Sequence, residues 1–264
     1  MERAAAQARN SPGGADWITN IQAFVLAYEG HLQQARTMTR RARDLAAQAH
    51  PTERAAMFEA GAAVREALFG NASDAKQRAQ AALELSKNRD VEYGAAFAFA
   101  AVGDSVKSRV LVDDLNKRFP EDTCVRFTYL PVVRAIIALN GGNSSEAIEL
   151  LKGAEPYDIA FTCSWFGFGS LYSPYVRGEA YLASHRYTEA AGEFQKVLGH
   201  PGIVFTDPVR AVAHIQLGRS FAMAGDKAKA KAAYQDFLTL WKDADSDIPI
   251  LNEGKAEYAK TIMR

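Results

Sequence analysis

The sequence has no excess of one charge and no long apolar run, and each absence excludes a class of protein. Its 31 acidic residues balance its 31 basic residues, whereas a nucleic-acid-binding domain normally carries a marked basic excess. The longest apolar run, GAAFAFAAVG at 94–103, falls well short of the ~18 residues that a membrane-spanning helix needs. We therefore expect neither a nucleic-acid partner nor a membrane span in this chain. The basic stretch RTMTRRAR at 36–43 is interpreted as the solvated face of a helix, with a local basic patch as the alternative.

Cysteine is almost absent, because the chain holds only Cys124 and Cys163. Two cysteines in a chain of this length do not make a disulfide scaffold. We expect two free thiols, with a bridge between them as the alternative.

The amino-terminal stretch MERAAAQARNSPGG lacks the apolar core of an export signal. It reads as the end of a helix, so we expect the chain to be a piece of a longer protein. The expected compartment is the cytoplasm, with the periplasm as the alternative if that longer protein is anchored in a membrane.

Signals of enzyme chemistry are also missing. The five histidines are dispersed and none has the spacing of a metal ligand pair. The acidic stretch DADSDIPILNEG at 243–254 lacks the glycine and the glutamate that a calcium loop requires. FGFGSL at 166–171 has no third glycine for a dinucleotide loop. We therefore expect no catalytic residue, no cofactor and no metal.

What the sequence does contain is a repeat. RGEAYLASHRYTEAAGEFQKVL at 177–198 and LGRSFAMAGDKAKAKAAYQDFL at 217–238 place a glycine, an aromatic, an alanine and a second aromatic at the same spacing. These are helical spacings on either side of a short break, which predicts two helices and a tight turn. The same spacing recovers four earlier copies. The predicted hairpins span approximately 15–49, 52–87, 89–119, 122–154, 172–199 and 207–243, followed by a capping helix at 248–262.

Elementary packing explains these residue types. A small residue in the first helix lets the second helix approach closely, and the aromatic residues fill the space beside it. Glycine at the turn adopts the left-handed conformation that ends a helix. Asp104, Ser144 and Asp226 follow such turns and are expected to cap the next helix. In such an array each hairpin buries its apolar face only against the adjacent hairpin, and the last helix covers the exposed end.

This pattern resembles the tetratricopeptide repeat family, over roughly residues 15–242. The resemblance implies an all-α, right-handed superhelix forming one domain, with a concave groove that binds a protein or peptide. REALFGNASDAKQRAQAALELS and LYSPYVRGEAYL further resemble the carboxy-terminal repeat region of bacterial serine/threonine kinases and related signalling regulators. The chain has none of the kinase motifs themselves. It is therefore expected to be a regulatory or recruitment part, with a kinase domain elsewhere in a longer protein as one arrangement.

The resemblance also assigns the wall of the groove. Carried onto this sequence, the groove residues include Tyr93, Phe97, Tyr129, Val132, Ile136, Tyr172, Tyr175, Glu179 and Arg219. Such an apolar, aromatic wall suits an extended hydrophobic peptide or an amphipathic helix. The alternative is that the curvature of the superhelix, or a loop, covers much of it. The insertion at 154–175 is rich in rings, and Trp165, Phe166 and Phe168 are either a binding cluster or the filling of a gap between repeats.

We expect a non-catalytic scaffold that binds a protein partner in bacterial signalling. Two alternatives stay open at this point. The chain could be a ligand-sensing regulatory domain, which an enclosed pocket in place of an open groove would favour. It could also be a self-association domain that forms a homodimer.

Overall fold

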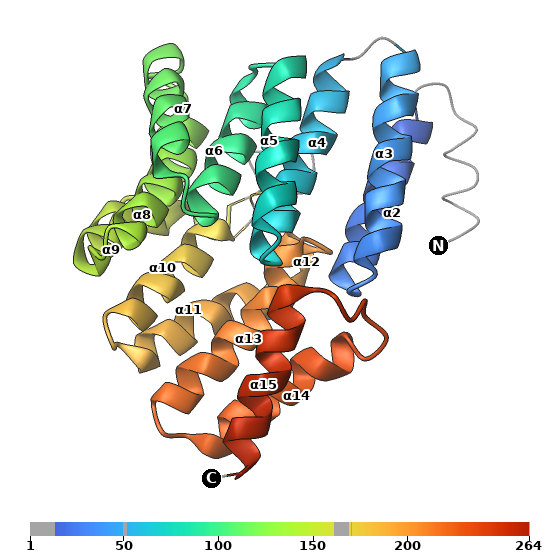
Figure 1. The fold of residues 1–264 in the computed structure, drawn as a ribbon. Helices are drawn as coiled ribbons and strands as arrows, with labels where there is room; N and C mark the ends of the chain where they lie inside the picture. The colour runs from blue at the N-terminus through green and yellow to red at the C-terminus, as the bar shows by residue number, and fades with distance from the viewer. Residues whose placement is uncertain (1–13, 50–51, 161–168, 170, 264) are drawn as a thin grey trace.

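The computed structural model describes residues 14–49, 52–160, 169 and 171–263, and these residues contain helices and no β-strand. The helices follow one another as antiparallel hairpins (Figure 1). The first three hairpins are α2 (Ala15–Tyr28) with α3 (Leu32–Gln48), α4 (Thr52–Leu68) with α5 (Ala72–Leu85), and α6 (Arg89–Ala101) with α7 (Ser105–Arg118). The next three are α8 (Leu130–Asn140) with α9 (Ser144–Lys152), α10 (Tyr172–Ala183) with α11 (Tyr187–Gly199), and α13 (Pro208–Met223) with α14 (Lys227–Leu240).

Three short turns and one final helix complete the described chain. A π-helical turn (Val125–Tyr129) leads into α8, where Pro131 lacks the N–H that would bond to the carbonyl four residues earlier. A 3-10 turn (Glu155–Tyr157) follows α9, and α12 (Pro201–Val204) precedes α13. The last helix is α15 (Pro249–Met263). The predicted all-α solenoid of helical hairpins is therefore confirmed.

Glycine ends the first helix in most hairpins. Gly30, Gly70, Gly103, Gly142 and Gly225 all have φ between 78° and 88°. His185 takes that place in the fifth hairpin, with φ of 59°. Asp104 and Asp226 cap the following helices through hydrogen bonds to the backbone N–H of Lys107 and Lys229. Ser144 does not act as a cap, because α9 begins at Ser144 and Asn143 precedes it as the N-cap residue.

The small residues of the repeat lie where the two helices of a hairpin contact each other. A Cβ atom added to Gly178 would lie 2.7 Å from the ring of Phe194, and one added to Gly218 would lie 2.8 Å from the ring of Tyr234. Each glycine therefore makes room for the aromatic residue that the repeat places on the second helix. The small residues at the matching positions of the other hairpins have no exposed surface: Ala23, Ala35, Ala63, Ala75, Ala96, Ser108, Ala135 and Ala147.

The array is not open at its ends, which corrects the expectation that hairpins cover only their neighbours. In Figure 1 the segment between α14 and α15 reaches the turns of the first two hairpins. The backbone N–H of Asp245 donates to the carbonyl of Gly30 at 3.1 Å, and that of Ile250 donates to the carbonyl of Phe69 at 3.2 Å. Helix α13 also contacts α2 and α4. The last hairpin is thus joined to the first two, and the concave side is enclosed.

Side-chain contacts reinforce this closure. The indole of Trp241 packs edge-on against the ring of Phe69, with the ring centroids 4.9 Å apart. The guanidinium of Arg210 lies 5.3 Å from the centroid of the Tyr28 ring. Aromatic pairs and cation–π contacts of this kind each add to the burial of the rings themselves. The closure is therefore a packed interface, held by more than a few backbone hydrogen bonds.

Cys124 lies just before the π-helical turn and forms a disulfide. The expectation of a free thiol at this position is therefore wrong. Cys163 lies outside the described residues.

Candidate functional site: the central cleft

The residues predicted to form an open groove wall lie in the interior. The ring of Tyr93 stacks on that of Tyr129 with centroids 3.8 Å apart and planes 3° from parallel. Phe97 meets Tyr93 edge-on and lies 4.9 Å from the ring of Tyr172. Tyr175 packs against Phe194 of the neighbouring helix α11. We call Tyr93, Phe97, Tyr129, Tyr172 and Tyr175 the aromatic seam, because these rings lie on the π-helical turn, α6 and α10 and all five are buried.

The hydroxyl groups of the seam have internal partners. Tyr129 donates to Asp90 Oδ1 at 2.8 Å, and Tyr172 donates to Asp207 Oδ1 at 3.1 Å. Burial holds the pKa of each tyrosine well above its usual value, and the nearby carboxyl raises it further. These hydroxyls therefore stay protonated, as donors that fix the orientation of the rings.

The seam is buried inside the array. None of its five side chains exposes more than 6% of its surface, and Val132 and Ile136 are equally enclosed. Of the predicted groove residues, Glu179 and Arg219 alone are partly exposed. The burial agrees with the alternative interpretation, that curvature or a loop covers the wall, and Gly169 of the insertion lies beside the ring of Tyr93.

The ring-rich insertion is described only in part. Tyr157 stacks on Phe127 of the π-helical turn, with centroids 5.0 Å apart. Asp158 pairs with the buried Arg177 and with Lys196. Trp165, Phe166 and Phe168 lie outside the described residues.

A cleft remains at the centre of the closed array. Its volume is about 410 Å³, in the lower part of the ~300–1,000 Å³ range of small-molecule sites. Six helices line it, and their lining residues include Leu68 of α4, Phe97 of α6, Ile136 and Asn140 of α8, Tyr175 and Glu179 of α10, Gln216 of α13 and Ile250 of α15. Four of the nine predicted groove residues therefore meet here, although the cleft is much shorter than a peptide groove.

Glu179 is the only ionisable carboxyl among the residues that line the cleft. Its Oε1 accepts a hydrogen bond from Gln216 Nε2 at 3.2 Å. Burial in the apolar wall raises the pKa of Glu179 to about 7, although the Tyr175 hydroxyl and the charge of Arg219 oppose the shift. The group therefore changes its charge near neutral pH.

Gln216 connects Glu179 to the last predicted groove residue, Arg219. The amide Nε2 donates to Glu179 and to the Tyr175 hydroxyl, while Oε1 accepts from Arg219 Nη1 at 3.4 Å. Arg219 itself points to a separate cleft between α13, α14 and α15, where it lies beside Tyr234 and Lys260. Glu179 therefore lines the central cleft, whereas Arg219 lines the cleft between α13, α14 and α15.

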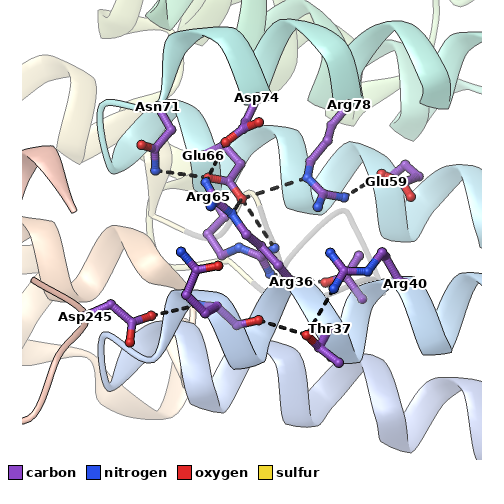
Figure 2. Close-up of polar contacts among 12 residues, drawn as sticks. Arg36, Thr37, Arg40, Glu59, Arg65, Glu66, Asn71, Asp74, Arg78 and Asp245 are labelled. Carbon is purple, nitrogen blue, oxygen red and sulfur yellow. Dashed lines mark hydrogen bonds and ion pairs between the residues drawn. The ribbon is translucent and has the colours of Figure 1, made fainter. Parts of the chain in front are cut away.

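A buried charge cluster braces the first two hairpins (Figure 2). Arg36 of α3 binds both carboxylate oxygens of Glu66 and pairs with Asp74. Arg78 of α5 pairs with Glu59 and lies 3.8 Å from Glu66. The basic stretch at 36–43 is therefore only partly a solvated face, because Arg36 and Arg43 pair with acidic residues while Arg40 and Arg41 are exposed.

Arg65 lies inside this cluster, fully enclosed. Its Nη1 donates to Thr39 Oγ1, and its Nη2 lies 3.9 Å from Glu66. Burial lowers the pKa of Arg65 to about 10, and the carboxylate of Glu66 opposes that shift. Acidic side chains balance the basic ones, so charge pairing within the cluster joins α3, α4 and α5, while Arg65 Nε makes no hydrogen bond among the described residues.

Sequence reasoning missed three parts of the site. Gln216 precedes the predicted wall residue Arg219 by three positions on α13, and Asn140 lies at the end of α8. A helical wheel drawn to the end of each first helix would have found both. Ile250 reaches the cleft only through closure, so no local pattern could have placed it there.

The described residues bring together no cluster of three or more His, Cys, Asp or Glu side chains suited to a metal ion. No helix among them combines the length and apolarity needed to cross a membrane. No family model matches the chain, and no curated protein matches it.

Proposed function

We propose that the chain is a non-catalytic, ligand-sensing module of the tetratricopeptide type, whose central cleft receives a small molecule. The observation that carries this proposal is the closure of the array around a cleft of about 410 Å³. The aromatic seam that an extended peptide would need is buried, so the site suits a small ligand better than it suits a peptide. Within a longer bacterial signalling protein, such a module would report ligand occupancy to a kinase or regulator.

Ligand binding in this cleft would act on the contacts that close the array. Ile250 lines the cleft, and its backbone N–H is bonded to the carbonyl of Phe69. A ligand that touches both α4 and α15 would therefore stabilise the closed state relative to an opened one. Differential binding to two such states is what a sensor requires.

The test is ligand-observed NMR with a fragment library of neutral, cationic and anionic members. Ala101 and Ala183 line the rim of the cleft and are exposed, so Ala101→Phe and Ala183→Phe fill it without disturbing the core. Ala232→Phe on the exposed face of α14 is the matched control. Fragments that bind the wild type and the control, but neither filled variant, support the proposal. The proposal would be overturned if no fragment binds, or if the fragments that bind the wild type also bind Ala101→Phe and Ala183→Phe.

A protein partner is the second candidate, and the outer face of α7 favours it. Val106 and Val110 lie one turn apart and are 77% and 64% exposed. Val110 borders a broad surface groove between α5 and α7. Exposed apolar side chains in a helical stripe suit a partner helix or a second copy of the chain. Light scattering on the purified chain and on Val106→Lys/Val110→Lys tests the second copy: a homodimer that the double variant dissociates supports it, and a monomeric wild type excludes it.

A further inference from the structure

The central cleft contains a carboxyl group without a counterion. Among the ion pairs of residues 14–49, 52–160, 169 and 171–263, none includes Glu179. Its protein partners are the amide of Gln216 and the hydroxyl of Tyr175. A carboxylate offers about four acceptor positions, so Glu179 keeps acceptor capacity toward the cleft.

The nearest guanidinium is already neutralised. Arg219 binds Glu257 through Nε and Nη2 and binds Glu253 at 2.7 Å. Arg219 Nη1 also donates to the side-chain amide oxygen Oε1 of Gln216. The charge of Arg219 therefore opposes the rise in the pKa of Glu179 without making an ion pair with it.

The other residues that line the cleft indicate which charge a ligand would carry. Among the described residues, no Lys, Arg or His side chain lines the cleft, so these residues offer an anion no counter-charge. Phe97, Ile136, Leu68 and Ile250 supply an apolar surface, and the rings of Phe97 and Tyr175 border the same space. A positive group bound here would meet one carboxylate and two aromatic rings.

We propose that the cleft binds a small organic ammonium ion, with Glu179 as its counterion and the apolar wall around its hydrocarbon part. This inference rests on the proposed ligand-sensing function and narrows it to one class of ligand. A largely desolvated carboxylate without a counterion is costly, and a ligand that brings the opposite charge lowers that cost on binding. Selectivity for cations over neutral molecules of equal size follows.

The affinity of the cleft for an ammonium ion should fall as the pH is lowered. The groups that face Glu179 are Tyr175 on its own helix, Gln216 and Arg219 on α13, Asn140 on α8, and, through Arg219, Glu253 and Glu257 on α15. Burial raises the pKa of Glu179 itself to about 7. The ammonium ion binds the ionised carboxylate, so its affinity is full above pH 7 and falls about tenfold per pH unit well below it. The same binding releases a proton at pH 6.

The experiment compares cyclohexylamine with cyclohexanol by isothermal titration calorimetry from pH 5 to pH 8.5, in two buffers of different ionisation enthalpy. We expect the amine to bind more tightly than the alcohol at pH 8, to lose about a hundredfold in affinity by pH 5, and to release a proton at pH 6. Glu179→Gln should weaken amine binding at least tenfold at pH 8 and abolish its pH dependence. Glu149→Gln on the exposed face of α9 is the control and should change nothing.

The outcomes separate this inference from the proposed function. Equal binding of amine and alcohol, or amine binding that Glu179→Gln leaves unchanged, overturns the ammonium assignment. If neutral fragments are lost in Ala183→Phe while the amine does not bind, the cleft remains the ligand site and its ligand is not an ammonium ion. If neither probe nor any fragment binds, both proposals fail. Should Glu179→Gln not fold, proton release by the wild type at pH 6 still decides the assignment.

Discussion

The indole Nε1 of Trp241 donates a hydrogen bond to the backbone carbonyl of Tyr28 at 2.8 Å, across 213 positions of sequence. The carbonyl lies at the end of the first helix of the first hairpin, and Trp241 follows the last helix of the sixth. The indole is almost fully buried there. This contact joins the two ends of the repeat array, and the site depends on that closure.

Gly30 tests the closure. It has φ of 83°, and a Cβ atom there would overlap Ala244 and approach Trp241 at 3.2 Å. Gly103 has φ of 82° with no atom within 4 Å of such a Cβ, so Gly103→Ala carries only the left-handed strain of about 1 kcal/mol. We expect Gly30→Ala to cost about 1–3 kcal/mol more than Gly103→Ala in urea unfolding, with a larger radius of gyration by small-angle scattering. Equal costs and equal radii would show that the closing contact is not formed in solution.

The small positions of the repeat make a second, independent prediction. Gly178→Ala places a methyl group against the ring of Phe194, while Gly192→Ala in the same hairpin meets nothing within 4 Å. Both changes favour the helical conformation by about 1 kcal/mol. We expect Gly192→Ala to stabilise the protein and Gly178→Ala to destabilise it by about 1–3 kcal/mol, because overpacking outweighs the gain. Thermal unfolding of the two variants measures the difference, and stabilisation by both would contradict the close helix approach.

The buried charge cluster predicts that loss of its carboxylate destabilises the protein more than loss of an exposed carboxylate does. Glu66→Gln removes the charge that faces Arg36, Arg65 and Arg78 (Figure 2). Removing one member of a buried ion pair costs about 3–5 kcal/mol. The exposed pair of Glu149 with Lys152 is the reference, and Glu149→Gln should change the free energy of unfolding by less than about 1 kcal/mol. A small effect of Glu66→Gln would mean that water reaches the cluster.

Asp207 predicts how stability depends on pH. Burial raises its pKa to about 8, although hydrogen bonds from Val209 and Tyr172 oppose the shift. The folded state therefore keeps a proton that the unfolded chain releases near pH 4. Its contribution to stability is full below about pH 4 and is lost as the pH rises to about 8, by up to about 1.4 kcal/mol per pH unit.

Asp207→Asn should therefore flatten the decline of stability between pH 5 and pH 8, as measured by urea unfolding at each pH. Asp226→Asn is the matched control, since Asp226 is also an N-cap residue but is partly exposed, and hydrogen bonding to Lys229 lowers its pKa. The control should leave the slope unchanged. A slope that Asp207→Asn does not alter would mean that Asp207 is already ionised in the folded protein.

Much of the fold could be predicted because its signals are local. Gly178 with Phe194 and Gly218 with Tyr234 carry the hairpin in their spacing, and the turn glycines mark where each first helix ends. The predicted groove residues lie on first helices, except Tyr129, which ends the π-helical turn before α8. Closure of the array could not be predicted, because it brings residues near 241–250 against residues near 28–70. The pairing of Arg36 with Glu66 also escaped prediction, because a charged side chain on a helix face does not reveal which neighbour it meets.

An open array of hairpins can gain or lose a unit, since each unit needs only a neighbour on either side. The bond between Trp241 and Tyr28 removes that freedom. Closure requires a set number of hairpins, because with one hairpin more or fewer the first and last hairpins would no longer meet. We therefore expect the number of hairpins, rather than the identity of any one surface residue, to be what such a chain can least afford to change.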